Sequence, residues 1–428
     1  MSLPLDYDCF SGGEPLMPLE AALALLRQRI RPVVAVETLP LEAAQDRVLA
    51  ADIVARFDVP GYDNAAVDGY AVFAEDLDPA GETRLPIAGR AAAGHPLDRP
   101  QPRGTAVRIF TGAPMPAGPD GAPGPDTVAM QEDCLVEGDQ VVIAAGLKRG
   151  RNRRRRGEDV AAGRKILEAG VRLRPQEIGL AAAAGQSKLA LRARLRVALF
   201  STGDELAEPG QPLTEGAIHD SNRYILGAML RQSGAAVSDL GILPDRPDAV
   251  RLALQVAARD HDLLLTSGGV STGEEDHVKA AVTAMGRLHF WRLAIKPGRP
   301  VALGQIDAAG RAVPFVGLPG NPVAAMVTYL RIARPLILGL TGATDLEPAR
   351  YRLPAAFAFS KKPDRREFLR GWIETNAAGQ QSVQRFERDG SGILTSMTAA
   401  TGLIEIAEEA TEIAPGDLVD FLPFAEMR

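Results

Sequence analysis

The chain passes from a short apolar run into a glycine-bearing turn and then a helix over Ala312-Val313-Pro314-Phe315-Val316-Gly317-Leu318-Pro319-Gly320-Asn321-Pro322. Asn321 suits the N-cap of a helix, and Pro322 suits its first position because the N–H that proline lacks has no helical partner there. The apolar pattern then continues to Leu340 and predicts a long buried helix. We therefore expect a strand, a turn and a helix in succession, which is a building block of an α/β domain.

The same succession recurs throughout residues 194–343. Residues 196–200 and 263–266 are short apolar runs that end in glycine-bearing loops, and the amphipathic stretch 249–258 precedes the second run. Alternating strands and helices predict a parallel sheet that is covered by helices on both faces. This region is therefore predicted to be an α/β domain.

The regions on either side have a different character. Apolar residues at helical spacing predict helices at residues 20–31, 41–49 and 175–185. Short β-type runs punctuated by Gly and Pro predict a β-rich barrel or sandwich over residues 51–147, and a small β-barrel after Pro348. Since 428 residues exceed what one core usually organises, we expect several domains.

Composition excludes several classes of protein. The formal net charge of −6 argues against nucleic acid as the main partner, because phosphate backbones select basic surfaces. Cys9 and Cys134 are far apart, which argues against a disulfide framework. No basic leader precedes an apolar stretch, which argues against a signal peptide, and no apolar run is long enough to span a membrane. The five histidines have no zinc or triad spacing. We expect a cytoplasmic protein that binds neither membrane nor nucleic acid.

Three loops fall where the predicted parallel strands end, at residues 201–205, 267–274 and 317–322. Ligands of open parallel sheets sit beyond these strand ends, and glycine lets the backbone approach a phosphate closely. One such loop would be a tight turn; three on one sheet edge favour a phosphate site, with the Ser267 and Ser271 hydroxyls as further donors.

Acids and cations accompany these loops. Glu205, Asp245 and Asp276 suit Mg²⁺, which takes one or two carboxylates with phosphate oxygens and waters, although each could equally be a helix cap. Arg292 and Lys296 would share one face of a strand and could face a common anion, although exposed cations usually just solvate a surface.

Two further segments are dense in turn-formers or charge. Residues 57–72 and 108–113 combine acids with turn residues, which alone supports only loops, and Asp68-Gly69 could be a hairpin turn. The arginine run at residues 149–156 is typical of a solvated or anion-attracting strip.

Taken in order, these strings resemble the molybdopterin molybdenumtransferases, the molybdenum insertases whose animal relative is the E domain of gephyrin. Each string alone is weak, whereas the ordered set is specific and covers nearly the whole chain. The matching strings are Asp63-Asn64-Ala65-Ala66-Val67-Asp68-Gly69-Tyr70-Ala71-Val72, residues 108–113, Gly157-Glu158-Asp159, residues 201–206, Asp220-Ser221-Asn222, residues 267–274 with Asp276, residues 295–300, residues 317–322, residues 366–371 and Gly390-Ser391-Gly392-Ile393-Leu394.

The resemblance implies an elongated, four-part subunit of α/β plus β class. Its parts would be a split extended linker domain at 1–50 and 148–193, a β-rich domain at 51–147, an α/β molybdopterin-binding domain at 194–343 and a C-terminal β-barrel at 344–428. It also implies a homodimer whose cleft joins the α/β domain to a β domain of the partner subunit. Contacts with molybdopterin adenylyltransferase and with molybdoenzyme maturation proteins would follow.

The implied reaction takes adenylylated molybdopterin and molybdate, hydrolyses the adenylyl bond in a Mg²⁺-dependent step, and releases molybdenum cofactor and AMP. By motif, catalytic positions fall on Asp68, Thr111, Asp159, Glu205, Asp276 and Lys296, and metal positions on Glu205, Asp245 and Asp276. The substrate-binding positions are Ser201, Gly203, Asp245, Ser267, Gly268, Gly269, Ser271, Arg292, Pro319, Gly320, Asn321, Arg365 and Ser391.

Departures from the family concern the geometry of a positive pocket, and two alternative functions also remain. Many relatives have Lys where Arg292 and Arg299 stand, and the planar guanidinium fork changes the geometry of a positive pocket. A molybdopterin adenylyltransferase would resemble residues 194–343 alone. A non-catalytic scaffold like gephyrin would keep the fold and bind a partner. The acids and cations retained at the site positions argue against a purely structural role.

Overall fold

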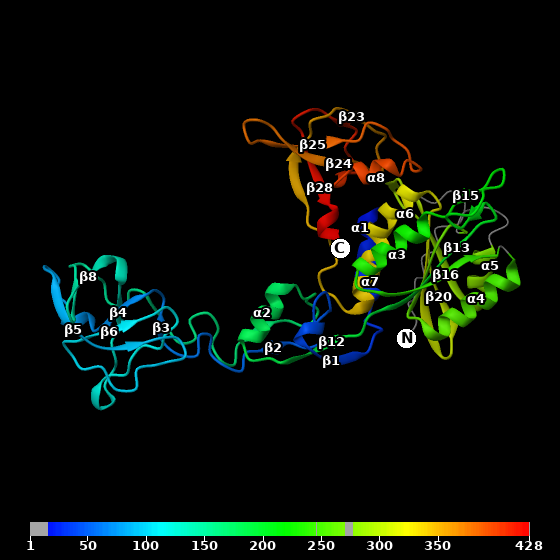
Figure 1. Cartoon of the computed structure of the whole chain (residues 1–428). Helices are drawn as coiled ribbons and strands as arrows, with labels where there is room; N and C mark the ends of the chain where they lie inside the picture. Colours follow the sequence, from blue (N-terminus) through cyan, green and yellow to red (C-terminus); the bar gives the residue numbers. More distant parts are fainter. Residues whose placement is uncertain (1–15, 245, 270–276, 428) are drawn as a thin grey trace.

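The computed structural model describes residues 16–244, 246–269 and 277–427, and the molecule is elongated (Figure 1). A β-rich end lies far from the α/β end, and a narrow region around β1, β2, β12 and α2 connects them. A second sheet, built from C-terminal strands, stands beside the α/β part.

The α/β part is built on a six-stranded mixed sheet. Its order is β16 (Ala236–Leu243), β13 (Arg196–Thr202), β17 (Leu263–Ser267), β21 (Arg311–Leu318), β20 (Pro300–Ala308) and β18 (Gly286–Arg292). The first four strands are parallel, as predicted, but β20 pairs antiparallel with β21 and with β18. The prediction of a parallel sheet was therefore wrong for these two pairings, because β20 runs against the other five strands. Ala309 and Gly310 join β20 to β21 with φ of 51° and 75°, a two-residue turn that only an antiparallel hairpin can use.

Helices cover both faces of this sheet, as predicted. Along β13, Val197 and Leu199 belong to one buried cluster with α1 (Leu19–Arg29) and α3 (Asn222–Gln232). The alternate residues Ala198 and Phe200 belong to another, with α4 (Pro247–Asp260) and α5 (His277–Met285).

The long apolar helix is continuous through α6 (Pro322–Thr328), a π-helical turn (Tyr329–Ala333) and α7 (Arg334–Thr341). This 20-residue segment has mean hydropathy 1.5, enough to cross a membrane by length and composition, yet 94% of its apolar window is buried inside the protein. That burial is typical of a core helix.

The β-rich end holds another six-stranded sheet. Its order is β7 (Thr127–Met130), β4 (Gly69–Val72), β6 (Ala106–Ile109), β5 (Thr83–Ala91), β9 (Gln140–Ile143) and β8 (Cys134–Glu137). The short pair β3 (Asn64–Ala65) and β10 (Arg153–Arg154) adjoins it, so part of the arginine run is a strand.

The connecting region pairs segments from far apart in the sequence. β1 (Val36–Pro40) pairs with β12 (Lys188–Arg192), and β2 (Ile53–Val54) pairs with β11 (Lys165–Leu167), while α2 spans Pro175–Ala183.

The helix predicted at residues 41–49 was wrong, since only a 3-10 turn forms at Leu41–Ala43. Asp46 has φ of 61°, which ends helical geometry, and Val48 and Leu49 instead bridge to Arg172 and Leu191.

The C-terminal sheet includes a strand from the α/β segment. Its order is β19 (Ile295–Lys296), β24 (Arg366–Thr375), β26 (Gly402–Ile406), β28 (Leu418–Pro423) and β22 (Tyr351–Pro354). β25 (Gln381–Arg385) extends β24, and β23 (Phe359–Ser360) pairs with β27 (Glu412–Ile413). Because β19 pairs in parallel with β24, Lys296 lies directly beside Glu367.

Candidate functional site

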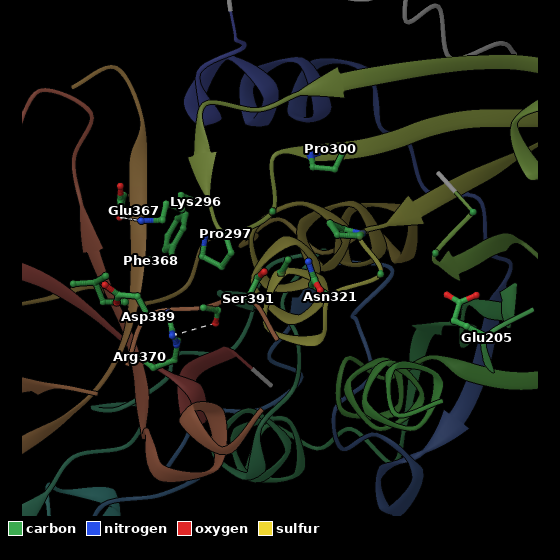
Figure 2. Close-up of a pocket in the computed structure, with 18 residues that line it drawn as sticks. Glu205, Lys296, Pro297, Pro300, Asn321, Glu367, Phe368, Arg370, Asp389 and Ser391 are labelled. Atoms are coloured by element: carbon green, nitrogen blue, oxygen red, sulfur yellow. Dashed lines mark hydrogen bonds and ion pairs between the residues drawn. The ribbon is translucent and has the colours of Figure 1, made fainter. Parts of the chain in front are cut away.

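A cavity of 680 Å³ opens where the carboxyl ends of the parallel strands meet the C-terminal sheet. Figure 2 shows Glu205 on one side of it and Lys296, Arg370 and Asp389 on the opposite side. The lining residues are Glu205, Gly268, Gly269, Lys296, Pro297, Gly298, Pro300, Pro319, Gly320, Asn321, Ala324, Glu367, Phe368, Leu369, Arg370, Asp389, Gly390 and Ser391.

A second cavity of 550 Å³ adjoins the first, with which it shares Glu205, Gly268, Gly320 and Asn321. Its other lining residues are Ser201, Thr202, Leu206, Ile218, His219, Asp220, Ser221, Asn222, Ser267, Pro322 and Gly392. The two cavities thus collect the described parts of the three predicted loops at one sheet edge.

Glycine is required in these loops by space as well as by backbone angle. Gly268 and Gly269 have φ of 84° and 63°, and a Cβ on Gly269 would meet Thr202 Oγ1 at 2.4 Å. At Gly203, whose φ is 147°, a Cβ would meet the Glu205 carboxylate at 2.5 Å. Any larger residue would therefore displace a side chain at the cavity edge.

A hydrogen-bond relay fixes the loops to one another. Asn222 Nδ2 donates to Ser267 Oγ at 2.8 Å and to the Gly320 carbonyl at 2.6 Å, and Ser267 Oγ donates to the Pro319 carbonyl at 3.0 Å. Asn321 begins α6 as predicted, but its side chain makes no capping hydrogen bond and lines both cavities instead.

Unpaired oxygens gather at the second cavity. Ser201 Oγ, Thr202 Oγ1 and Asn222 Oδ1 are buried and have no hydrogen-bond partner in the part of the chain that the structure describes. Buried polar atoms are normally paired, so this edge of the sheet is suited to a polar ligand or ordered water.

The opposite wall carries paired charges. Glu367 is 1% exposed, and its carboxylate accepts from Lys296 Nζ at 3.1 Å and from Arg365 Nε at 2.9 Å. Lys296 remains 47% exposed, so its ammonium can still meet a ligand. Arg365 joins the group through Glu367 but does not line either cavity.

The expected pairing of Arg292 with Lys296 on one strand face was wrong. β18 ends at Arg292 and β19 starts at Ile295 in a different sheet, so the strand alternation is interrupted between them. Arg292 lines neither cavity.

Sequence reasoning assigned no role to Glu367 or Arg370, although both lie in a string that resembled the family. Arg370 is 4% exposed, and burial lowers the pKa of its guanidinium. Its presence in the wall with Asp389 and Ser391 depends on how β24 packs, which no local pattern reveals.

The remaining predicted residues lie elsewhere. Asp68 and Thr111 adjoin β4 and β6 at the β-rich end, where Thr111 donates to the Asp68 carboxylate from Oγ1 at 2.7 Å and from its backbone N–H at 2.8 Å. These bonds lower the pKa of Asp68. Asp159 lines neither cavity, and its backbone N–H donates to the Val59 carbonyl.

Asp245, Ser271 and Asp276 lie outside the described residues. Within residues 16–244, 246–269 and 277–427, no group of three His, Cys, Asp or Glu side chains could hold a metal. Of the three predicted metal ligands, Glu205 is therefore the one whose position is described.

Curated relatives resemble the chain over almost its full length. It is 36% identical over 411 residues to "Molybdopterin molybdenumtransferase" of Haemophilus influenzae, covering 96% of this chain and 99% of that protein. It is also 36% identical to "Molybdopterin molybdenumtransferase 2" of Mycobacterium tuberculosis, covering 93% and 96%. The chain belongs to the molybdopterin molybdenumtransferase family. The resemblance seen in the sequence is thereby confirmed, and with it membership of a transferase family in molybdenum cofactor biosynthesis.

Family sequence models cover both walls of the cavity. The MoeA N-terminal region (domain I and II) matches residues 17–185, a "probable molybdopterin binding domain" matches 198–339, and the MoeA C-terminal region (domain IV) matches 352–424. The crystal structure titled molybdopterin biosynthesis moeA protein from Pyrococcus horikoshii OT3 superposes with a TM-score of 0.79 at 28% identity, covering 95% of this chain and all of that one. The 680 Å³ cavity thus lies between the segments matched by the second and third models.

Proposed function

We propose that the chain is a molybdopterin molybdenumtransferase that receives adenylylated molybdopterin and molybdate in the joined cavities. The observation that carries the proposal is the union of glycine loops, a carboxylate and cationic side chains around one hollow. Glycine loops suit a phosphate group, and Lys296 suits an oxyanion such as molybdate.

The two walls would bind different substrates. The pterin phosphate would bind at the loops, through Ser201, Gly203, Ser267 to Gly269, Ser271 and Pro319 to Asn321. The molybdate would bind at Lys296 and Ser391, with Arg365 acting through Glu367. Release of AMP leaves negative charge on phosphoryl oxygens, which a nearby cation such as Lys296 would stabilise.

Mg²⁺ fits the residues present at the loop wall. Glu205 supplies a carboxylate between the two cavities, and the unpaired Ser201 and Thr202 hydroxyls add oxygen atoms of the kind that Mg²⁺ prefers. When bound, the ion would neutralise charge on the phosphate oxygens. We include Asp245 and Asp276 in this site, and expect Asp276→Asn to weaken Mg²⁺ binding measured by calorimetry in the presence of the pterin substrate; unchanged binding would remove Asp276 from the site.

Asp68, Thr111 and Asp159 can serve this reaction only in a dimer. In one chain Asp68 and Thr111 are at the far end of an elongated molecule, Asp159 lies beside Val160 near the connecting region, and none of the three lines either cavity (Figure 1). A homodimer with two-fold symmetry would bring the β-rich end of one subunit to the cavity of the other. We accordingly propose the four-part division at residues 50, 147, 193 and 343, with cleft residues drawn from two subunits.

The proposal also sets the protein in the cytoplasm, where molybdopterin adenylyltransferase would deliver the substrate and molybdoenzyme maturation proteins would accept the product. The alternative of an adenylyltransferase is less favoured, because relatives named molybdopterin molybdenumtransferase match nearly the whole chain.

The decisive experiment supplies the purified protein with adenylylated molybdopterin and Mg²⁺ and measures AMP before and after molybdate is added. We expect molybdate to trigger AMP release. A scaffold protein would release none, and an adenylyltransferase would instead need ATP and unmodified molybdopterin.

A further inference from the structure

The wall of the cavity opposite the glycine loops includes a short loop that contains Asp389, Gly390 and Ser391. This loop is attached on two sides. The carbonyl of Ser391 accepts from the backbone N–H of Val323 at 2.9 Å, which ties the loop to the first turn of α6. On the other side, Arg385 of β25 pairs with Asp389 at 3.5 Å, and a second side chain reaches the loop from β24.

That side chain is Arg370, which Figure 2 shows beside Asp389 and Ser391. Its Nη2 donates to the carbonyl of Arg388 at 3.0 Å and to that of Gly390 at 3.4 Å. Its Nε donates to Ser396 Oγ at 3.0 Å, and Ser396 Oγ in turn donates to the Ile393 carbonyl at 2.6 Å. One guanidinium therefore holds both sides of the loop and the start of the following helix, α8 (Thr395–Ala399).

The chemistry of these contacts requires a guanidinium. Arg370 is buried, and these partners are neutral oxygens, so the charge serves hydrogen bonding rather than a close ion pair here. A planar fork can donate in several fixed directions at once, whereas a lysine ammonium is a single point on a flexible stem. A buried arginine kept for packing alone would not need these three directed bonds.

We propose that Arg370 is a positioning residue that sets the place of Ser391, and hence the oxyanion end of the cavity. It acts through the loop, by fixing the carbonyls of residues 388 and 390 to its guanidinium. The inference rests on the proposed function for the identity of the oxyanion, but the loop attachment itself is independent of that assignment.

The test compares Arg370→Lys with the wild-type protein in molybdate-dependent AMP release. Loss of the fork should raise the half-saturating molybdate concentration about tenfold, as expected when a binding group is misplaced by part of an ångström. The rate at saturating molybdate and the half-saturating pterin concentration should stay within about twofold of wild type. As a control, Arg352→Lys removes the fork of an exposed arginine on β22 of the same sheet, which pairs with Asp420 at 3.7 Å, and should change none of these quantities.

A second readout needs no substrate. Hydrogen exchange at the Val323 amide should become faster in Arg370→Lys and stay unchanged in Arg352→Lys, because a released loop no longer holds its carbonyl against α6. If Arg370→Lys does not fold, Ser396→Ala keeps the arginine and removes one anchor, and should shift both readouts in the same direction by a smaller factor.

The positioning role would be overturned if the half-saturating molybdate concentration were unchanged in Arg370→Lys. It would also be overturned if the rate fell and the half-saturating concentrations of molybdate and pterin rose by the same factor. Absence of AMP release from the wild-type protein would instead overturn the proposed function, while Val323 exchange would still decide whether Arg370 holds the loop.

Discussion

The two walls of the cavity are built in different ways. The loop wall comes from the ends of β13, β17 and β21, with glycine backbone and buried oxygens that lack partners in the described chain. The opposite wall comes from β19, β24 and the loop before α8. Its Lys296, Arg365 and Glu367 are paired with one another, and Arg370 is bonded to backbone carbonyls. Unpaired oxygens suit a ligand that supplies the missing bonds, whereas paired charges hold a fixed electrostatic field in place.

The difference makes the loop wall the more sensitive to a single atom. Gly269→Ala adds a Cβ 2.4 Å from Thr202 Oγ1 at a backbone φ of 63°. A non-glycine residue at such an angle costs about 1–3 kcal/mol, and misplacing the loop should lower turnover by about 100-fold or more. Steady-state AMP release measures the effect.

Gly310→Ala is the matched control, because Gly310 has φ of 75° but nothing within 4 Å of the added Cβ. It should lower the melting temperature without lowering turnover per folded molecule. Equal turnover in the two variants would show that the loop wall does not hold the substrate.

The charged wall should respond through oxyanion binding and through a slower release of AMP, whereas the loop wall should still bind the pterin substrate. Lys296→Ala leaves Glu367 buried with Arg365 as its remaining cationic partner and removes the half-exposed ammonium. We expect the half-saturating molybdate concentration to rise about tenfold, while binding of the pterin substrate is retained.

Lys165→Ala is its control, since Lys165 is also 47% exposed and paired with Glu168 at 2.8 Å, but is in the connecting region. An equal shift of the half-saturating molybdate concentration in both variants would mean that Lys296 acts only through the net charge of the protein.

Mixing subunits tests whether the β-rich end of one subunit contributes a third surface to the cavity of the other. Asp68→Asn and Lys296→Ala should each be impaired alone. Randomly mixed dimers of the two would contain one intact site in half of the molecules, which restores about a quarter of wild-type activity if each site draws on both subunits. No recovery after refolding the two variants together would exclude a shared site.

The smallest effect concerns Asp68 itself. Its two hydrogen bonds from Thr111 lower its pKa below the ordinary value of 3.8. Because the pKa of Asp68 is lower in the folded state, its ionisation stabilises the fold at pH values above the pKa of the unfolded chain. This stabilisation is lost as the pH falls through the pKa of the folded state. Thr111→Val removes the hydroxyl donor, so the Asp68 pKa measured by NMR should move upward toward 3.8; an unmoved value would mean that the backbone bond suffices.

The same contrast explains what could be predicted from the sequence. The loop wall is formed by continuous segments such as residues 317–322, in which the turn and the start of the helix depend on local sequence. The helices on both faces of the sheet follow from the alternation of strand and helix patterns. The structure agrees with these predictions.

The charged wall depends on pairing between distant segments. Nothing near Lys296 indicates that it lies beside Glu367, because that contact requires β19 to leave the α/β sheet and join β24. For the same reason the face shared by Arg292 and Lys296 was predicted wrongly, and Arg370 received no role. Strand direction was misjudged at β20, where a two-residue turn determines it rather than the apolar pattern.

The account depends on an oxyanion binding within the 680 Å³ cavity, against the charged wall. Anomalous X-ray diffraction at the molybdenum edge, from crystals soaked in molybdate, would locate the metal directly. We predict a peak between the Lys296 ammonium and the Ser391 hydroxyl. A peak outside the cavity, or none there at concentrations that saturate turnover, would contradict the account.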